Sequence, residues 1–300
     1  MKGIEDLRKI AVLGAGTMGH GIAQVLVQAG FEVVLYDLEE RLCEEGKRRI
    51  EVMLEKGKTL GKVSEEDMRS ALSRISTTAS LDEACLGAGA VIEAAPERME
   101  IKKEIFGRVE ELVDRDCLLA TNTSSLSVSE IAKDLVAPER FVGLHYFNPP
   151  PLMKLLEIVR GERSSPRILD LAREFALRQG KEPILVRDSP GFASSRLGLA
   201  LGLEAVRMVE EGVASPSDID KAMKLGYRHP MGPLELTDLV GLDVRLSIAR
   251  YLSAELDEAR FAPPRLLEDL VAKGRLGRKV GRGFYEWKDG RPVEGSGGLP

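Results

Sequence analysis

The sequence has few cysteines and no long apolar run, so it lacks the features that are typical of disulfide-rich, secreted and membrane proteins. Only three cysteines occur among 300 residues, Cys43, Cys85 and Cys117, and their spacing forms neither a CxxC pair nor a disulfide framework. We therefore expect buried thiols in a reducing compartment and no bound metal. No apolar run approaches the roughly 18 residues of a membrane span, and the start of the chain lacks the apolar core of a secretory signal. We expect a cytoplasmic protein with no membrane partner.

A large excess of charge of one sign is also lacking. The chain has 43 Lys and Arg against 48 Asp and Glu, a formal net charge of −5. Such a chain has no global basic field to attract a polyanion, so we expect no nucleic-acid partner. At 300 residues it is long enough for two domains.

A strand–turn–helix–strand pattern opens the chain. The apolar run Lys9–Leu13 leads into a cluster of glycines, and Ile22–Ala29 then predicts a helix. Gly30 is suited to ending that helix. The β-rich run Phe31–Tyr36 follows and ends at Asp37. These features predict one βαβ unit at the front of the chain.

Strand-like runs recur further along, separated mostly by helical stretches. They are Ala90–Ala94, Leu118–Ala120, Phe141–Leu144 and Ile184–Val186. After turn formers at 188–191, helical patterns dominate, in the segments Ser195–Glu211, Ser217–Leu225 and Leu239–Leu256. The alternation predicts the α/β class. We expect a Rossmann-type, doubly wound, mostly parallel sheet in residues 1–187, followed by a smaller all-α domain in residues 188–300.

The glycine cluster has the spacing of a dinucleotide-binding turn. It comprises Gly14, Ala15, Gly16, Thr17, Met18 and Gly19, which fit GxGxxG between a strand and a helix. In that pattern Gly14 permits the tight turn, Gly16 lets the backbone approach a pyrophosphate, and Gly19 allows helix to pack on strand. Asp37 is placed to accept hydrogen bonds from ribose hydroxyls and to repel a 2′-phosphate. The cluster favours NAD over NADP, and a Rossmann-like turn without a nucleotide is the alternative.

His145 stands out among the three histidines. It follows the apolar run Phe141–Leu144 and precedes a proline-rich turn, so it lies at a strand's carboxyl end, where open α/β sheets bind ligands. Glu157 lies within another apolar stretch, where a carboxylate needs a partner. Pairing with His145 would satisfy the carboxylate and make the imidazole a better base. Hydrogen bonds from backbone amides are the alternative. His20 and His229 fit packing or surface roles.

Five small polar residues, Thr121–Ser125, follow the run Leu118–Ala120. At the carboxyl end of a strand, such residues are suited to hydrogen bonding with a ligand. The alternative is that several of them cap a helix that begins near Ser127.

These motifs together resemble the stand-alone L-3-hydroxyacyl-CoA dehydrogenases, a family that includes bacterial 3-hydroxybutyryl-CoA dehydrogenases. The resemblance extends from about Ile10 to Trp287, and its order of motifs is far more specific than the glycine turn alone. The motifs are Gly14–Gly19, Asn122–Leu126, His145–Pro149, Met153–Glu157, Pro190–Phe192, Met231–Pro233 and Gly281–Tyr285.

The resemblance implies roles for individual residues. His145 matches the family's catalytic histidine, and Glu157 matches the carboxylate that pairs with it. Ser124 and Asn148 match polar residues that contact substrate and nicotinamide. The positions that match further NAD contacts are Glu97, Lys102 and Lys279. The family fold implies an N-terminal NAD domain and a helical domain that dimerises and closes over the cleft. The implied partners are therefore an acyl-CoA substrate and a second copy of the chain.

One departure from the family pattern concerns the substrate. Where the family has asparagine after the Pro-Gly-Phe motif, this chain has Ser195, which is shorter but still hydrogen-bonding. Two other functions use the same cofactor platform. One is a dehydrogenase of a free hydroxy acid or sugar acid, and the other is a non-catalytic NAD-binding protein of this fold. The intact set of His145, Glu157, Ser124 and Asn148 favours the acyl-CoA dehydrogenase.

Overall fold

The computed structural model describes residues 3–256, 258–293 and 295–297. Its chain divides into two compact units, of which the first ends at Ser189 and the second begins at Pro190. In the described residues, no helix combines the length and the apolar character needed to cross a membrane.

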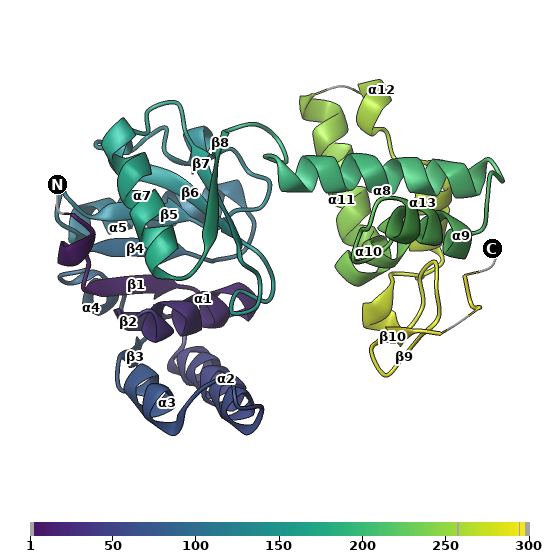
Figure 1. The fold of residues 1–300 in the computed structure, drawn as a ribbon. Coiled ribbons are helices and arrows are strands. Elements are labelled where there is room, and N and C mark those ends of the chain that lie inside the picture. Colours follow the sequence, from purple (N-terminus) through teal and green to yellow (C-terminus); the bar gives the residue numbers. More distant parts are fainter. Residues whose placement is uncertain (1–2, 257, 294, 298–300) are drawn as a thin grey trace. The chain divides into compact units, whose positions relative to one another are not determined.

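An eight-stranded sheet forms the centre of the first unit, in the order β3-β2-β1-β4-β5-β6-β7-β8 (Figure 1). The first six strands are parallel, whereas β7 runs antiparallel to β6, and β8 runs parallel to β7. The sheet confirms the predicted Rossmann-type class. Its strands are β1 (Lys9–Leu13), β2 (Glu32–Tyr36), β3 (Ile75–Thr78), β4 (Ala90–Glu93), β5 (Leu118–Thr121), β6 (Phe141–Tyr146), β7 (Leu155–Arg160) and β8 (Glu182–Arg187).

Helices flank this sheet and bury its inner strands, whereas the edge strand β8 is largely exposed. Parallel strands covered on both faces are apolar almost throughout, which explains runs such as Lys9–Leu13. Residues of β1 share one apolar core with Ile22 of α1 and Phe175 of α7. The helical segments are η1 (Ile4–Asp6), α1 (Thr17–Gln28), α2 (Glu40–Thr59), α3 (Glu65–Leu72), α4 (Leu81–Cys85), α5 (Met99–Leu112), α6 (Val128–Ile131), η2 (Pro138–Arg140) and α7 (Pro166–Arg178).

The second unit is built mainly of helices around its own apolar core, as the sequence predicted. The buried Asp238 carboxylate in α10 accepts hydrogen bonds from the backbone N–H groups of Phe284 (2.7 Å) and Tyr285 (3.0 Å) and from the indole of Trp287 (2.8 Å). These bonds tie the C-terminal segment to the helices. The elements are α8 (Ser194–Glu210), α9 (Pro216–Lys221), η3 (Ala222–Gly226), α10 (Pro233–Val240), α11 (Leu242–Glu255), α12 (Glu258–Phe261), α13 (Arg265–Ala272), η4 (Arg278–Val280), β9 (Trp287–Lys288) and β10 (Arg291–Pro292).

Some local predictions were wrong or incomplete. The single helix expected at Leu239–Leu256 is two helices, because Gly241 between them has φ +106°, outside the helical region. The helix expected at Ser217–Leu225 ends at Lys221 and continues as the π-helix η3. Strands β3 and β7 were not among the predicted strands.

The glycine turn between β1 and α1 is closed by direct backbone packing. Gly14 has φ +106°, a conformation that glycine adopts without strain. A Cβ atom on Gly19 would lie 1.6 Å from the carbonyl oxygen of Gly14. The first turn of α1 can therefore approach the end of β1 only because residue 19 has no side chain.

We predict that Gly19→Ala destabilises the protein by about 1–3 kcal/mol, since the turn must move to admit a methyl group. Gly107→Ala is the matched control: Gly107 is exposed within α5, and a Cβ there would meet nothing within 4 Å. The control should stabilise the protein by about 0.5–1 kcal/mol, because alanine favours helix. Urea denaturation followed by circular dichroism measures both changes. A Gly19→Ala protein as stable as the wild type would contradict the packing.

Candidate active site

The residues predicted for the site follow successive strands at one edge of the sheet. Gly14 follows β1, Asp37 follows β2, Glu97 lies just beyond β4, Ser124 lies beyond β5, and His145 is near the end of β6. These five strands are parallel, so their carboxyl ends meet at the same edge. The topology thus gathers residues that are up to 131 positions apart, from Gly14 to His145, along a single edge.

His145 and Glu157 face each other across neighbouring strands. They are direct partners in the antiparallel pairing of β6 and β7, so their side chains lie on the same face of the sheet. The imidazole Nδ1 is 2.6 Å from the carboxylate Oε2 of Glu157. His145 is 7% exposed and Glu157 is fully buried. With Nδ1–H donating to the carboxylate, Nε2 of the neutral ring carries the lone pair that can accept a proton.

Neighbouring groups hold the segment around His145. The amide oxygen of Asn122 accepts a hydrogen bond from the backbone N–H of Tyr146 (2.9 Å). The ring of Phe147 lies 4.5 Å from the imidazole, measured between centroids. The buried ammonium of Lys181 donates to the carbonyl oxygens of Pro150 (2.5 Å) and Met153 (2.8 Å). These contacts hold the end of β6 and the loop that follows His145.

The loop after β6 also reaches the helix that follows the glycine turn. A Cβ atom on Gly21 in α1 would lie 2.7 Å from Cδ of Pro150. Gly21 is four residues from the N-terminus of α1, at Thr17. The histidine segment and the glycine turn are therefore neighbours in space within the first unit.

Glu97 organises the polar loop after β5. Its Oε1 accepts hydrogen bonds from the hydroxyl of Thr123 (2.7 Å) and from the backbone N–H groups of Ser124 (2.9 Å) and Ser125 (3.1 Å). Burial would raise the pKa of the Glu97 carboxyl, but Lys102 and these donors hold it below its usual value. The capping role at α6 belongs to Ser127, whose hydroxyl accepts from Glu130 N–H. Ser124 therefore does not cap that helix, and its hydroxyl donates to Glu97 instead (3.2 Å).

A buried carboxylate that the sequence analysis passed over supports this loop. Glu93, at the end of β4, is fully buried, and its Oε1 lies 2.6 Å from the ammonium of Lys102. Its Oε2 accepts a hydrogen bond from the hydroxyl of Thr121 (2.6 Å). Burial raises the pKa of Glu93. The ammonium of Lys102 also lies 3.4 Å from Glu97, which links the two carboxylates. The sequence signal that could have predicted this buried carboxylate was an acidic residue inside the apolar run Ala90–Ala94.

The glycine turn has the features that a bound dinucleotide needs. A Cβ atom on Gly16, at the N-cap of α1, would meet nothing within 4 Å, so the space above that backbone is open. The carboxylate of Asp37 accepts hydrogen bonds from the backbone N–H groups of Ala15 and Leu38, both at 2.8 Å. These bonds hold it beside the turn. The residues present thus fit a pyrophosphate over the start of α1 and a ribose at Asp37.

The remaining candidates divide between the units. Asn148 is exposed in the loop after β6. Ser195 is partly buried in the first turn of α8. The ammonium of Lys279 is exposed and lies 2.6 Å from each carboxylate oxygen of Asp243. Burial would raise the pKa of the Asp243 carboxyl, but its bond to Lys279 brings it below the usual value.

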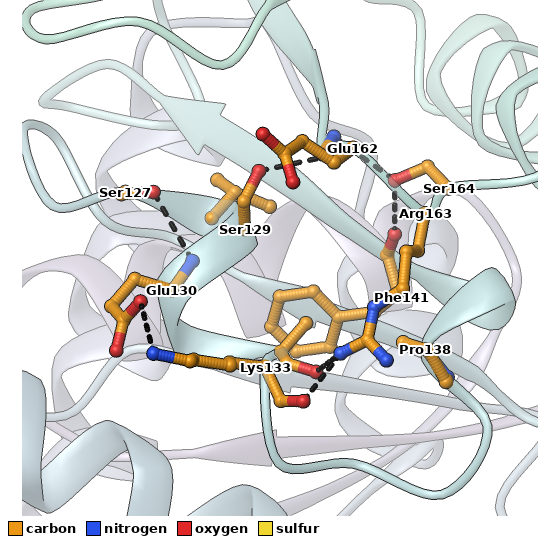
Figure 2. A pocket seen from close by; sticks show the side chains of 12 residues that line it. Ser127, Ser129, Glu130, Lys133, Pro138, Phe141, Glu162, Arg163 and Ser164 are labelled. Atoms are coloured by element: carbon orange, nitrogen blue, oxygen red, sulfur yellow. Dashed lines mark hydrogen bonds and ion pairs between the residues drawn. The ribbon is translucent and has the colours of Figure 1, made fainter.

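A hollow of about 400 Å³ in the first unit lies at the other end of β6 (Figure 2). Phe141, the first residue of β6, lines it, so it is at the amino end of the strand that carries His145. Its polar groups bond to one another: Ser164 donates to the Phe141 carbonyl (2.6 Å), and Arg163 donates to the carbonyl oxygens of Ala132 and Lys133. The hollow is thus separate from the candidate site.

Models of one protein family match nearly the whole chain. The family model described as "3-hydroxyacyl-CoA dehydrogenase, NAD binding domain" matches residues 9–189. The model described as "3-hydroxyacyl-CoA dehydrogenase, C-terminal domain" matches residues 191–287. The two matches follow each other in the order of the two units.

Similar proteins also match over most of the chain. A probable 3-hydroxybutyryl-CoA dehydrogenase of Bacillus subtilis is 42% identical over 284 residues, 95% of this chain and 99% of that protein. A 3-hydroxyadipyl-CoA dehydrogenase of Escherichia coli is 40% identical over 94% of this chain and 60% of that protein. The crystal structure of (S)-3-hydroxybutyryl-CoA dehydrogenase from Ralstonia eutropha has a TM-score of 0.91 and 37% identity, covering 94% of this chain and 100% of that one.

We predict that Asp37→Ser raises the ratio of kcat/KM with NADPH to kcat/KM with NADH by about tenfold or more. The serine keeps a hydrogen-bond acceptor beside Ala15 but removes the charge that repels a 2′-phosphate. Steady-state kinetics with both coenzymes measure the ratio. Glu39→Gln is the control, because Glu39 is an exposed carboxylate two residues further along. An unchanged ratio in Asp37→Ser, or an equal rise in Glu39→Gln, would contradict the role of Asp37.

Proposed function

The chain belongs to the 3-hydroxyacyl-CoA dehydrogenase family, and we propose that His145 and Glu157 perform the proton transfer of its reaction. The protein is an NAD-dependent oxidoreductase that converts an L-3-hydroxyacyl-CoA and NAD⁺ into the 3-ketoacyl-CoA, NADH and a proton. The preferred substrate in this proposal has a short acyl chain, as in 3-hydroxybutyryl-CoA. The observation that carries the proposal is the 2.6 Å pair of His145 and Glu157 at the ligand-binding edge of the sheet.

The proposed mechanism uses His145 as the general base. NAD⁺ supplies the acceptor for the hydride that leaves C3 of the substrate. Nε2 of His145 takes the hydroxyl proton as the C3 carbonyl forms, and the carboxylate of Glu157 stabilises the imidazolium. Since Glu157 is fully buried, its negative charge acts on the ring with little screening by water. In the reverse direction His145 returns the proton.

Ser124 and Asn148 orient the reacting groups in this proposal, and Glu97 holds the loop that carries Ser124. A loop with five donors converging on one carboxylate oxygen is already ordered before ligand binds. Lys102 acts on the coenzyme site together with Glu97, to which it lies close. The backbone of residues 14–19 and the carboxylate of Asp37 bind the pyrophosphate and the adenosine ribose.

We assign four roles to the second unit. Ser195 contacts the substrate, Lys279 contacts NAD, and the helices close over the cleft and form the contact of a homodimer. Large exposed apolar side chains in this unit, among them Leu197 (71%) and Leu225 (81%), are suited to such a contact. We place the enzyme in the cytoplasm, where buried thiols such as Cys43 and Cys85 stay reduced.

The thioester is the feature that separates this function from that of a free hydroxy-acid dehydrogenase. We predict that the protein oxidises NADH with acetoacetyl-CoA and shows less than about 1% of that kcat/KM with free acetoacetate. Such a ratio corresponds to roughly 3 kcal/mol of binding to the CoA part in the transition state. The decrease in absorbance at the NADH band measures both rates. Turnover of the free acid alone would overturn the proposal, and NADH binding without turnover of either compound would indicate a non-catalytic protein.

We predict that His145→Gln lowers kcat by at least about 100-fold, because a general base usually supplies 10²–10⁴-fold. NADH affinity, followed by fluorescence titration, should change little, since the change leaves the glycine turn and Asp37 intact. Near-normal turnover by this variant would exclude His145 as the base.

Glu157→Gln is the companion variant, because glutamine keeps an oxygen opposite Nδ1 but removes the charge. It should lose less activity than His145→Gln, about tenfold, and the pH profile of kcat should shift. A profile identical to that of the wild type would contradict the coupling between Glu157 and His145.

A further inference from the structure

Arg245 occupies a core position of the second unit. It lies in α11, three residues after Leu242 and four before Ala249, so all three share one face of the helix. Leu242 and Ala249 are fully buried in the apolar core, and Arg245 itself is only 6% exposed. A guanidinium therefore stands where the helical pattern calls for an apolar side chain.

Among the described residues, the guanidinium has no counter-charge. In the part of the chain that the structure describes, no hydrogen bond or ion pair involves the side chain of Arg245, and its Nε is closed off from solvent without a partner. Burial lowers the pKa of Arg245 to about 10, and the group is still protonated at neutral pH. A buried cation without a partner is strongly unfavourable, so such a group indicates that an anion arrives from outside.

Among the described residues, each of the other buried cations has a polar partner, although Nε of Arg140 lacks one. The ammonium of Lys102 contacts Glu93, and that of Lys181 donates to two carbonyl oxygens. The guanidinium of Arg140 donates to the carbonyl of Asp114 (2.6 Å) and lies 3.5 Å from Glu110. Arg245 differs from all three, because its guanidinium has no such partner.

The free end of Arg245 faces α8 near a predicted substrate residue. A Cβ atom on Gly198 would lie 3.7 Å from Nη1 and 4.0 Å from Nη2, so no side chain of residue 198 separates the guanidinium from that helix. Ser195 is three residues earlier in α8, on the same side of the helix and about 4.5 Å along its axis. The guanidinium thus lies within about one helical turn of Ser195.

We propose that Arg245 binds a carboxylate at the end of the acyl chain, so that among acyl chains of equal length the enzyme prefers the 3-hydroxyacyl-CoA thioester of the dicarboxylic acid. The inference rests on the proposed function, in which Ser195 contacts the substrate. A guanidinium matches a carboxylate by two parallel hydrogen bonds. An acyl chain brings that carboxylate in together with methylene groups, which suit the apolar surroundings of Arg245. The phosphates of CoA carry more charge and a nucleotide, so they fit a nearly buried position less well.

The test compares two six-carbon substrates that differ only in the terminal group, 3-ketohexanoyl-CoA and 3-ketoadipyl-CoA. We expect the wild type to reduce the dicarboxylic thioester with at least about tenfold higher kcat/KM. Arg245→Met, which conserves the length and apolar part of the side chain, should lose about 100-fold on 3-ketoadipyl-CoA, mainly in KM. Its kcat/KM on 3-ketohexanoyl-CoA should stay within about threefold of the wild type.

Two further variants serve as controls. Arg250→Met removes an exposed arginine of the same helix that pairs with Glu268, and it should leave the substrate ratio unchanged. Arg245→Lys keeps the charge but loses the paired donors, so its ratio should fall between those of the wild type and Arg245→Met. A thermal melt of each protein identifies a variant that has failed to fold.

The wild-type protein alone tests the proposal even if Arg245→Met does not fold. If its kcat/KM values on 3-ketoadipyl-CoA and 3-ketohexanoyl-CoA are about equal, the proposal is overturned. Equal losses on both substrates in a folded Arg245→Met would also overturn it and would assign the arginine to CoA phosphate or to the fold. A change in oligomeric state with an unchanged substrate ratio would assign it to a subunit contact instead. If the wild type reduces neither thioester, the proposed function itself fails. Reduction of 3-ketohexanoyl-CoA without a carboxylate preference refutes only the role of Arg245.

Discussion

The antiparallel pairing of β7 with β6 is the constraint on which the candidate site depends. The six strands before β7 are parallel, as in other nucleotide-binding α/β sheets, and only the reversal of β7 brings Glu157 back opposite His145. A slip of one residue in this pairing would turn the Glu157 side chain to the other face. The carboxylate, fully buried between two strands, would then lose the imidazole that satisfies it.

Carboxylates with different partners recur at this edge of the sheet; Glu157 and Glu93 are buried, whereas Glu97 is exposed. Glu157 contacts an imidazole, Glu93 contacts the ammonium of Lys102, and Glu97 collects the donors of the loop after β5. Each carboxylate orders a polar segment around it, and for the buried Glu157 and Glu93 an unpaired charge would be costly. The site is therefore rigid in the first unit before any ligand binds. Arg245 in the second unit is the contrasting case, in which the charge is present and its partner is not.

Much of the fold could be predicted because its signals are local. The glycine turn, Asp37 and the apolar runs of β1, β2, β4, β5 and β6 are each contained in a few neighbouring residues. Strand β7 was harder to predict, since its apolar run contains Glu157 and its direction depends on a neighbour. The helix expected across Gly241 failed because apolar periodicity continues through a residue whose φ of +106° interrupts it. The buried role of Glu93 was missed because its partner Lys102 lies on another element.

The sequence by itself determined the α/β class, the dinucleotide turn and the identity of the chemical groups, because these follow from residue type and short spacing. It left open whether Glu157 meets His145 or backbone amides, since a carboxylate in an apolar run accepts either. Only the tertiary structure decided that question, through the register of two strands joined by an eight-residue loop, 147–154. It likewise decided that Lys102 has a partner and Arg245 has none. Whether a buried charge has a partner depends on the residues that pack against it, and these residues are distant along the chain.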